Sequence, residues 1–351
     1  MPYPPFVRVS GRFTVEVSAL VSSGSIGNYT QIATAKLVLL NGTAYEGVPI
    51  ITGNSLKHWH SVYLVENYVS LGGKYANILC KHGIGLRGLK HDVDSFDKIS
   101  KGSYANSEQE AIIDVCNDIH GFLIPEKQLK RDSIVEVSNA IPVLTEDNLE
   151  NVSKFAIQYN RVVPYTVSKN LGEGQEGQGM MVFKQEHASV PLFGFAMSMD
   201  LGWILRPKYE GNGSIVSELP NKDDNVTEER KRRAKAALLA VLNLITGSGS
   251  KRARSLPIIG VQELMIVVSN VPIPKLVHAA FDNYAAQTID ALRIYASNIN
   301  GAEIHVHCYS ASSKPINGCE QRSSDKVQMH SHSSLEDMFN NVINETLSMM
   351  K

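Results

Sequence analysis

The sequence predicts an α+β protein whose core has the order strand, helix, strand, strand, helix, strand, which is the ferredoxin-like (split βαβ) arrangement. One observation is the alternation of apolar and polar residues near the start of the chain. Val7, Val9, Phe13, Val15 and Val17 fall at odd positions and indicate a half-buried strand. The other is a pair of helical segments with strand-like segments between and after them. RNA-recognition domains share this topology with many proteins that never bind RNA, so the fold alone decides no function.

The core elements follow one another along the chain. The first strand lies within 6–21, and the first helix begins inside the segment VPIITGNSLKHWHSVYLVENYV, 48–69. We expect the second and third strands at 132–142 and 192–205, and the fourth at 261–270. The second core helix is predicted from Thr227 to Ile245, because it carries an apolar stripe and is followed by Gly247 as a C-cap.

The remaining segments elaborate this core within a single domain, 1–351. A polar loop, 22–36, leads to a possible strand at 36–40, and the Gly-rich stretch 71–106 reads as an irregular insert. Ser107 and Glu110 form a possible capping box for a short helix over 107–119. Strand-like flanks around a Gly-rich tip predict a long hairpin at 160–190. The last part is predicted to contain a helix at 284–297, a strand at 302–309 and a terminal helix.

Composition limits the classes of function. The chain has 351 residues, 43% of them hydrophobic, and a formal net charge of -1, so a nucleic-acid partner would need a local basic patch. Cys80, Cys116, Cys308 and Cys319 show no C-x-x-C pair, which predicts free thiols in a reducing compartment. The N-terminus does not resemble a signal peptide and no apolar stretch is long enough to span a bilayer. We therefore expect a cytoplasmic protein without a membrane partner.

The start of the first helix is unusually polar and basic for a connection. Asn54, Lys57 and His58 fall on the face opposite Leu56, and Gly53 would allow close backbone approach. Free N–H groups and a partial positive charge at a helix start suit a phosphate. An ordinary Asn cap followed by a solvated lysine explains the same residues, and both readings stay open. His60 lies near the core face and is expected to be a satisfied, partly buried histidine.

A second basic segment follows the second core helix. The loop GSGSKRARSLP holds Lys251, Arg252 and Arg254, and between Thr227 and Arg254 eight basic residues face two acidic ones, a local charge of +6. The helical charges are equally consistent with a solvated face. A Gly/Ser loop with Lys and Arg is well suited to a phosphodiester backbone.

Two further patterns are set aside. The G-x-G-x-x-G at 172–177 contains two glutamates and lies in a hairpin tip, so we reject a dinucleotide site. The C-terminal histidines and cysteines match no common zinc spacing, so no metal and no cofactor are predicted, although metal binding there stays open. These residues are His305, His307, Cys308, Cys319, His330 and His332.

Several motifs in order resemble one known family. They are VSGRFTVEVSAL with GNYT downstream, VPIITGNSLKHWH, HGFLIP, the NRV before the hairpin, LFGFAMSMDLG and GSKRARSLP. Together they resemble the crRNA-binding backbone subunit of type I CRISPR interference complexes (Cascade), in the DevR branch of the RAMP superfamily, closest to subtype I-A. The segments 71–106 and the tail after 300 match poorly.

The resemblance implies a hand-like subunit that binds guide RNA. An RNA-recognition-like palm would carry a finger insert at 71–130, a thumb hairpin at 155–192 and a C-terminal extension at 271–351. Copies would repeat head to tail along the crRNA, with other Cascade subunits, and present the guide to a target DNA strand. RNA-binding residues by this resemblance are Asn28, Gly53, Asn54, Lys57, His58, Lys130, Arg131, Arg161, Lys251, Arg252 and Arg254. Contacts should reach phosphate and sugar, because a guide is bound whatever its sequence.

Two alternatives remain beside this non-enzymatic reading. One is an RNA endonuclease of the same superfamily with His58 as general acid/base. Related type III subunits cleave target RNA with a loop aspartate and a metal, but the loop 22–36 contains no Asp. The other is a scaffold protein that binds no nucleic acid, which the ultraviolet absorbance ratio of the purified protein would distinguish.

Overall fold

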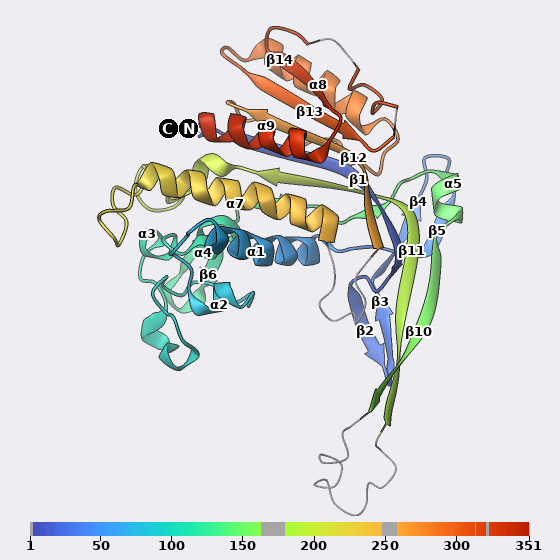
Figure 1. Cartoon of the computed structure of the whole chain (residues 1–351), viewed down its shortest axis with the longest axis horizontal. Coiled ribbons are helices and arrows are strands. Elements are labelled where there is room, and N and C mark those ends of the chain that lie inside the picture. Colours follow the sequence, from blue (N-terminus) through green and yellow to red (C-terminus); the bar gives the residue numbers. More distant parts are fainter. Residues whose placement is uncertain (1–2, 163–179, 248–257, 313, 321–322, 351) are drawn as a thin grey trace, which may run out of the picture.

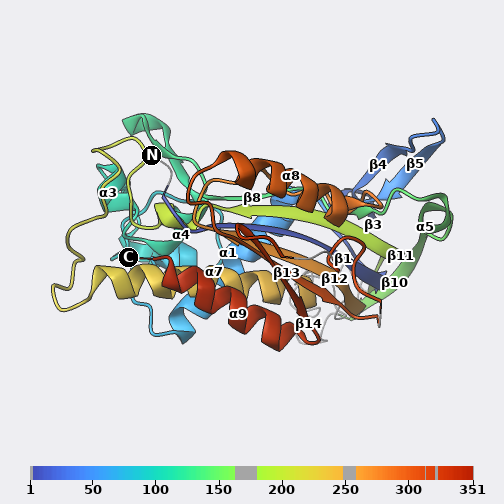
Figure 2. The same cartoon turned by 90° about the horizontal axis from the view of Figure 1, so that it is seen from above.

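A computed structural model describes residues 3–162, 180–247, 258–312, 314–320 and 323–350. The chain is an α+β protein built on one large mixed sheet with helices on both faces (Figures 1 and 2). The strand order is β14-β13-β12-β1-β11-β3-β2, and β8, β9 and β10 also pair with β11. These strands are β1 (Phe6–Ser18), β2 (Ser22–Ile26), β3 (Tyr29–Ile32), β8 (Val135–Val137), β9 (Ile141–Pro142), β10 (Ser153–Val162), β11 (Met180–Met199), β12 (Ile258–Ser269), β13 (Ile304–Ser310) and β14 (Val327–His332).

The centre of the sheet contains the predicted core elements. β1 pairs antiparallel with β12 on one side and with β11 on the other, and β8 pairs antiparallel with β11. In chain order the core reads β1, α1 (Gly53–Ser70), β8, β11, α7 (Val226–Gly247), β12. This order matches the predicted succession of strand, helix, strand, strand, helix, strand. The third strand, predicted at 192–205, is instead the second half of β11, which also forms the hairpin and ends at Met199 before a 3-10 turn at Leu201–Trp203.

Three helices cover one face of the sheet. α1 and α7 lie side by side, and α9 (Leu335–Ser348) lies beside α7 (Figures 1 and 2). Val7, Val9, Phe13 and Val15 of β1 point into this core, where they meet the apolar sides of α1 and α7. Val17, predicted on the same face, is exposed, and its φ is 46°. Both α1 and α7 carry apolar residues at helical spacing, which allowed them to be predicted from the sequence. The stripe of α7 is long, and its ends were predicted within two residues.

The opposite face of β1 is also buried, which corrects the prediction of a half-buried strand. Arg8, Ser10 and Arg12 point toward the segment that follows β12, ahead of α8 (Tyr284–Asn298). Ser10 Oγ donates to the carbonyl of Val277 at 2.9 Å, and Arg12 Nε donates to the carbonyl of Ala279 at 2.8 Å. Backbone carbonyls and the carboxylates of Asp200 and Glu263 thus pair with these side chains, which makes their burial tolerable, although Arg8 Nε has no partner among the described residues.

The segment between α1 and β8 is a compact insert with short elements. It contains α2 (Ile78–Lys81), α3 (Glu108–Ala111), α4 (Val115–His120), β6 (Phe122–Ile124), β7 (Leu129–Arg131) and short 3-10 turns. The single helix predicted over 107–119 is wrong, because Asp114 ends one turn and caps the next. Its carboxylate accepts the N–H of Asn117 at 2.9 Å and that of Asn77 at 2.7 Å. The Ser107 cap is present, with Oγ accepting from Glu110 N at 3.1 Å.

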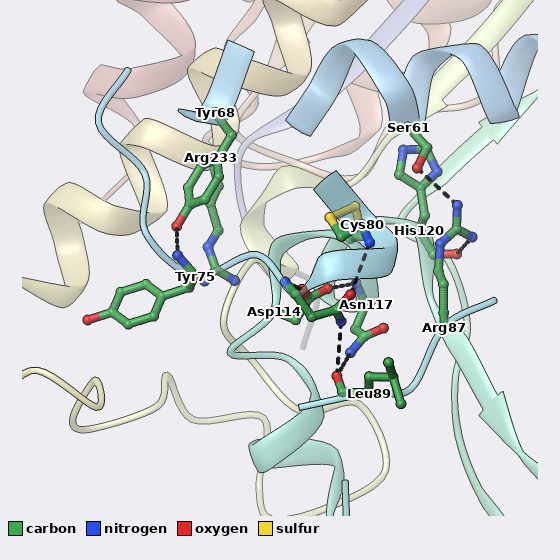
Figure 3. The surroundings of a disulfide bond; sticks show 12 residues. Ser61, Tyr68, Tyr75, Cys80, Arg87, Leu89, Asp114, Asn117, His120 and Arg233 are labelled. Atoms are coloured by element: carbon green, nitrogen blue, oxygen red, sulfur yellow. Dashed lines mark hydrogen bonds between the residues drawn. A yellow bond between two sulfur atoms is a disulfide. The ribbon is translucent and has the colours of Figure 1, made fainter. Parts of the chain in front are cut away.

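All four cysteines form disulfides, which corrects the prediction of free thiols. Cys80 in α2 is bonded to Cys116 in α4, 36 residues apart (Figure 3). Cys308 is bonded to Cys319, 11 residues apart. Neither pair is close enough in sequence to form a recognisable motif, so spacing could not reveal them.

Some strands were missed because they are short and polar. The loop predicted at 22–36 contains the β2–β3 hairpin, and β14 lies in the polar stretch before α9, parallel to β13. The predicted strand at 36–40 is β4 (Thr34–Val38), which pairs with β5 (Ala44–Pro49) near α5 (Glu146–Glu150). The long hairpin is present as β10 and β11, while its Gly-rich tip, 163–179, lies outside the described residues.

Candidate nucleic-acid interface

A cleft of about 590 Å³ lies where α1 begins beside the β2–β3 hairpin and the first residues of β11, at Phe183 and Gln185. Ser25 and Thr30 line it from the hairpin, His58 and Trp59 from α1, and Phe183 from β11. The wall therefore combines hydroxyl groups with two half-buried aromatic rings. Such rings are suited to stacking on bases or sugars, and hydroxyls to phosphate oxygens.

The start of α1 is more fully paired than the sequence suggested. Thr52, not Asn54, is the N-cap, and its Oγ1 accepts from Ser55 N at 3.4 Å. Gly53 is buried, and its N–H donates to Asn139 Oδ1 at 2.7 Å. A Cβ on Gly53 would lie 2.5 Å from the carbonyl oxygen of Val137. The close approach predicted at Gly53 is therefore made to the protein's own strand, and its N–H is not free for a phosphate.

The first two turns of α1 still present polar and cationic groups. Asn54 and His58 are exposed, Lys57 is half-buried, and the ring of His58 contacts Trp59 edge to face at 5.4 Å between centroids. Burial lowers the pKa of Lys57, as does the nearby positive charge of Arg87, while Glu136 opposes them. An anion would relieve this repulsion between cations, so the pair favours negative ligands.

Arg87 was missed by the sequence analysis because it lies in a segment without periodicity. It donates to Ser61 Oγ of α1 at 3.0 Å and to the carbonyl of His120 at 3.4 Å (Figure 3). These bonds hold a cation against the flank of α1 near Lys57. Its local sequence offered no signal for this placement.

His60 is satisfied, as predicted, but it is fully buried. Its Nε2 lies 3.1 Å from the carbonyl oxygen of Ala237, and its Nδ1 lies 3.0 Å from Nε2 of His120. Burial lowers the pKa of His60 to about 4. It therefore ties α1 to α7 as a neutral ring and takes no part in the cleft.

The neighbours Lys130 and Arg131 have different environments. Lys130 is exposed, with Nζ 4.9 Å from the ring centroid of Tyr209. The Arg131 side chain is fully buried and forms ion pairs with Glu108 at 2.9 Å and Asp118 at 2.8 Å. Arg131 is thus a structural residue, and its prediction as an RNA contact is wrong.

Several basic residues of α7 are, like Arg131, buried and paired within the protein. Arg230 and Arg233 are buried, and Arg233 pairs with Asp118 and Glu229 at 2.9 Å each. Arg232 also pairs with Glu229. Of the eight basic residues counted in this stretch, Arg232 and Arg233 therefore neutralise buried carboxylates and Arg230 is buried against backbone carbonyls, so these three charges serve the core.

Other predicted residues have limited structural description. Asn28 is exposed in the turn between β2 and β3, and its carbonyl accepts from Lys184 N at 2.8 Å. Arg161 lies in β10 opposite Met181, and its side chain is outside the described part. Lys251, Arg252 and Arg254 also lie outside the described residues.

A family described as "CRISPR-associated negative auto-regulator DevR/Csa2" matches residues 9–289. The chain belongs to the DevR/Csa2 family. A CRISPR-associated protein Cas7/Cst2/DevR of Thermoproteus tenax is 45% identical over 98% of this chain and 96% of its own length. The DevR/Csa2 match excludes most of α8 and everything after it.

Two more distant likenesses accompany this family match. A protein of Saccharolobus solfataricus named "CRISPR-associated aCascade subunit Cas7/Csa2 2" is 26% identical over 83% of this chain and 88% of its own. A chain of a solved structure named "CRISPR RNA-guided surveillance complex, pre-nicking" is 11% identical over 97% of this chain and 100% of that chain, with a TM-score of 0.44. At that score the likeness does not establish a shared fold. In the described part of this DevR/Csa2 chain, no helix is both long and apolar enough to cross a membrane.

Proposed function

We propose that this DevR/Csa2 chain binds CRISPR guide RNA along its phosphate backbone, as the repeating head-to-tail subunit of a Cascade-type complex in the cytoplasm. Family membership across residues 9–289 is the observation that carries the proposal. The relative named as an aCascade subunit supports it. In the assembled complex the guide would face a target DNA strand, alongside other Cascade subunits. Heterologous contacts that do not close into a ring give such a filament.

The proposal assigns parts of the chain to a hand-like subunit. The spatial order β12-β1-β11-β8, with antiparallel neighbours, supports a ferredoxin-like, RNA-recognition-like palm within a single domain. The insert 71–130 would be the finger, and the hairpin 155–192 the thumb. The extension 271–351 packs on the palm through the bonds to Ser10 and Arg12.

The proposed RNA path runs through the cleft at the start of α1. Trp59 and Phe183, which line the cleft, would stack on sugars or bases, and Lys57 and Arg87, which lie outside its lining, would bind phosphate beside it. Asn28, Asn54, His58, Lys130, Arg161, Lys251, Arg252 and Arg254 remain proposed contacts, while Gly53 and Arg131 are assigned to packing and the core. Contacts of this kind hold a guide without reading its sequence.

We propose that the subunit does not cleave RNA. Among the described residues, Cys80 and Cys116 are joined in a disulfide and offer no thiolate to a metal ion, and the other possible metal group, His305–His330–Glu345, lies on β13, β14 and α9 rather than on α1 with His58. The alternative, His58 as a general acid/base, is tested by incubating end-labelled RNA with wild type and His58→Ala, with and without divalent metal. Cleavage by wild type that is lost in the variant would overturn the non-enzymatic proposal.

The proposed contacts to the RNA backbone are tested with single-stranded RNAs of unrelated sequence. If about four phosphates are neutralised per subunit, the slope of log K against log salt should be about -3. Lys57→Ala should weaken binding of every RNA about equally, whereas Lys314→Ala, an exposed lysine of the C-terminal extension, should not. Equal affinity of wild type and Lys57→Ala, or a strong preference for one sequence, would contradict the proposal.

The head-to-tail arrangement is tested by varying RNA length. The number of bound copies should rise in steps as the RNA is lengthened, and deletion of 172–179 from the thumb should disturb this spacing while the subunit stays folded. A single bound copy on every RNA length would refute the filament but not RNA binding itself.

A further inference from the structure

Four histidines form a stacked row on β13 and β14, outside the range that the family match covers. The two strands are parallel, and His307 is directly opposite His330. The centroids of these two rings are 4.7 Å apart, and that of His305 is 5.4 Å from His330. α9 passes beside the row and adds Glu345.

Two histidines of this row and Glu345 bring three possible metal-ligand atoms close together. His305 Nδ1, His330 Nε2 and a carboxylate oxygen of Glu345 all lie within 4.8 Å of one another. The distance from His305 Nδ1 to His330 Nε2 is 3.2 Å, and that to Glu345 Oε1 is 3.5 Å. A tetrahedral ion with bonds of about 2.0–2.1 Å separates neighbouring ligand atoms by about 3.3 Å, which matches both distances.

Outer carboxylate contacts orient these ligands. Glu303 Oε1 lies 3.2 Å from His305 Nε2, so it accepts that proton and leaves the Nδ1 lone pair facing the cluster. His307 Nε2 lies 2.8 Å from Glu345 Oε2, which fixes the carboxylate and leaves Oε1 directed at His305. A carboxylate or a further ring behind each ligand is the usual support of a metal site.

Without an ion, these atoms can be paired by hydrogen bonds. With the Nε2 proton of His305 donated to Glu303, His330 Nε2 can donate its proton to His305 Nδ1 at 3.2 Å, and Glu345 accepts from His307 at 2.8 Å. A cation would instead be bound by the two ring nitrogens and the carboxylate oxygen at once, because each of the three can act as an electron-pair donor to a metal.

We propose that His305, His330 and Glu345 bind one divalent transition-metal ion of the zinc class. Two imidazole nitrogens and one carboxylate oxygen are a common ligand set for Zn²⁺, with water in the fourth position. A cleft of about 480 Å³ that His305 and Glu345 line gives that water access. The ion holds β13, β14 and α9 together. All three elements belong to the C-terminal extension, so the ion stabilises the packing within it. The sequence spacing gave no signal because the ligands come from two strands and a helix.

The test uses untagged full-length protein stripped with a chelator. Isothermal titration with Zn²⁺ should show one tight site per chain, and Co²⁺ should give the visible absorption of a four-coordinate ion. His330→Gln and Glu345→Gln should each lower the Zn²⁺ affinity about 100-fold or more, since even loss of a supporting residue costs 10–100-fold. His82→Gln is the matched control, because His82 is exposed and lies against Phe96 in the insert.

Thermal melting supplies a second readout. Zn²⁺ should raise the melting temperature of wild type and His82→Gln but not of His330→Gln, because an ion stabilises only the state that binds it. Wild type that takes up no Zn²⁺ or Co²⁺ would overturn the proposal, and so would unchanged affinity in both ligand variants. Neither outcome depends on RNA binding, so the metal site and the proposed function fail separately.

Discussion

Lys130 and Arg131 are adjacent basic residues with opposite expected roles. Replacing Arg131 by Gln should destabilise the protein, and replacing Lys130 by Gln should not. Arg131 has no exposed side chain and makes two buried ion pairs. It also donates to three carbonyls, those of Asp118, Trp203 and Arg206.

The expected loss of stability in Arg131→Gln depends on the partners that Asp118 and Glu108 retain. Removing one partner of a buried ion pair typically costs about 3–5 kcal/mol. Asp118 retains Arg233 at 2.9 Å, and Glu108 still accepts the N–H groups of Lys208 and Tyr209 at 2.8 and 2.7 Å. The loss should therefore be at the lower end, about 3 kcal/mol. Unfolding entropy of about 2.1 cal/mol/K per residue over 351 residues converts this to about 4 °C in melting temperature.

The assay compares urea midpoints, melting temperatures and RNA affinities of the two variants. Arg131→Gln should melt about 4 °C lower and, where folded, bind RNA like wild type. Lys130→Gln should melt within the range of a surface substitution, about ±0.5 kcal/mol, and weaken RNA binding. An Arg131→Gln variant with normal stability and weakened RNA binding would refute the buried-network reasoning.

Four further outcomes are expected from measurements of stability. Gly53→Ala should lose about 1–3 kcal/mol, because the new Cβ meets strand backbone, and an unchanged urea midpoint would contradict this. The folded-state pKa of His60, about 4, lies below its unfolded value of about 6.5, so its stability contribution is complete above pH 6.5 and falls as the pH drops toward 4, by about 2 kcal/mol at pH 5. The pKa of Asp114, raised to about 6 by burial, opposes this, so Asp114→Asn should show a steeper loss between pH 7 and 5 than wild type. Replacing both Cys80 and Cys116 by Ala should cost about 4 kcal/mol for a 36-residue loop, and equal midpoints of variant and wild type would show that the pair is not bonded in solution.

The fold was predictable from the sequence where patterns are local and long. α7 has an uninterrupted apolar stripe, and β12 a run of apolar residues, so both were placed correctly. The β2–β3 hairpin and β14 are short and polar, so neither has a long apolar pattern. β2 pairs with the neighbouring β3, whereas β14 pairs along its length with β13. The helix predicted over 107–119 failed because Asp114 caps a new turn instead of continuing the old one.

The candidate site was predictable only in outline. The exposed face of α1, with Asn54, Lys57 and His58, was recognised from its angular spacing. Whether a cation is solvated or buried depends on acids brought from elsewhere, so the sequence could not separate Arg131 from Lys130. Arg87 reaches α1 across 26 residues from Ser61, and no periodic signal marks such a contact.

The closed second face of the sheet has a consequence for how any RNA could be bound. RNA-recognition domains of the common kind lay two or three bases flat on aromatic rings of an open sheet. Here the corresponding face of β1 carries Arg8, Ser10 and Arg12, and the backbone of 273–282 covers it. If the chain binds RNA as proposed, the strand would have to pass beside this covered face rather than lie flat on it. Contacts to sugar and phosphate at the edge of the sheet would then leave the base edges available to a second strand.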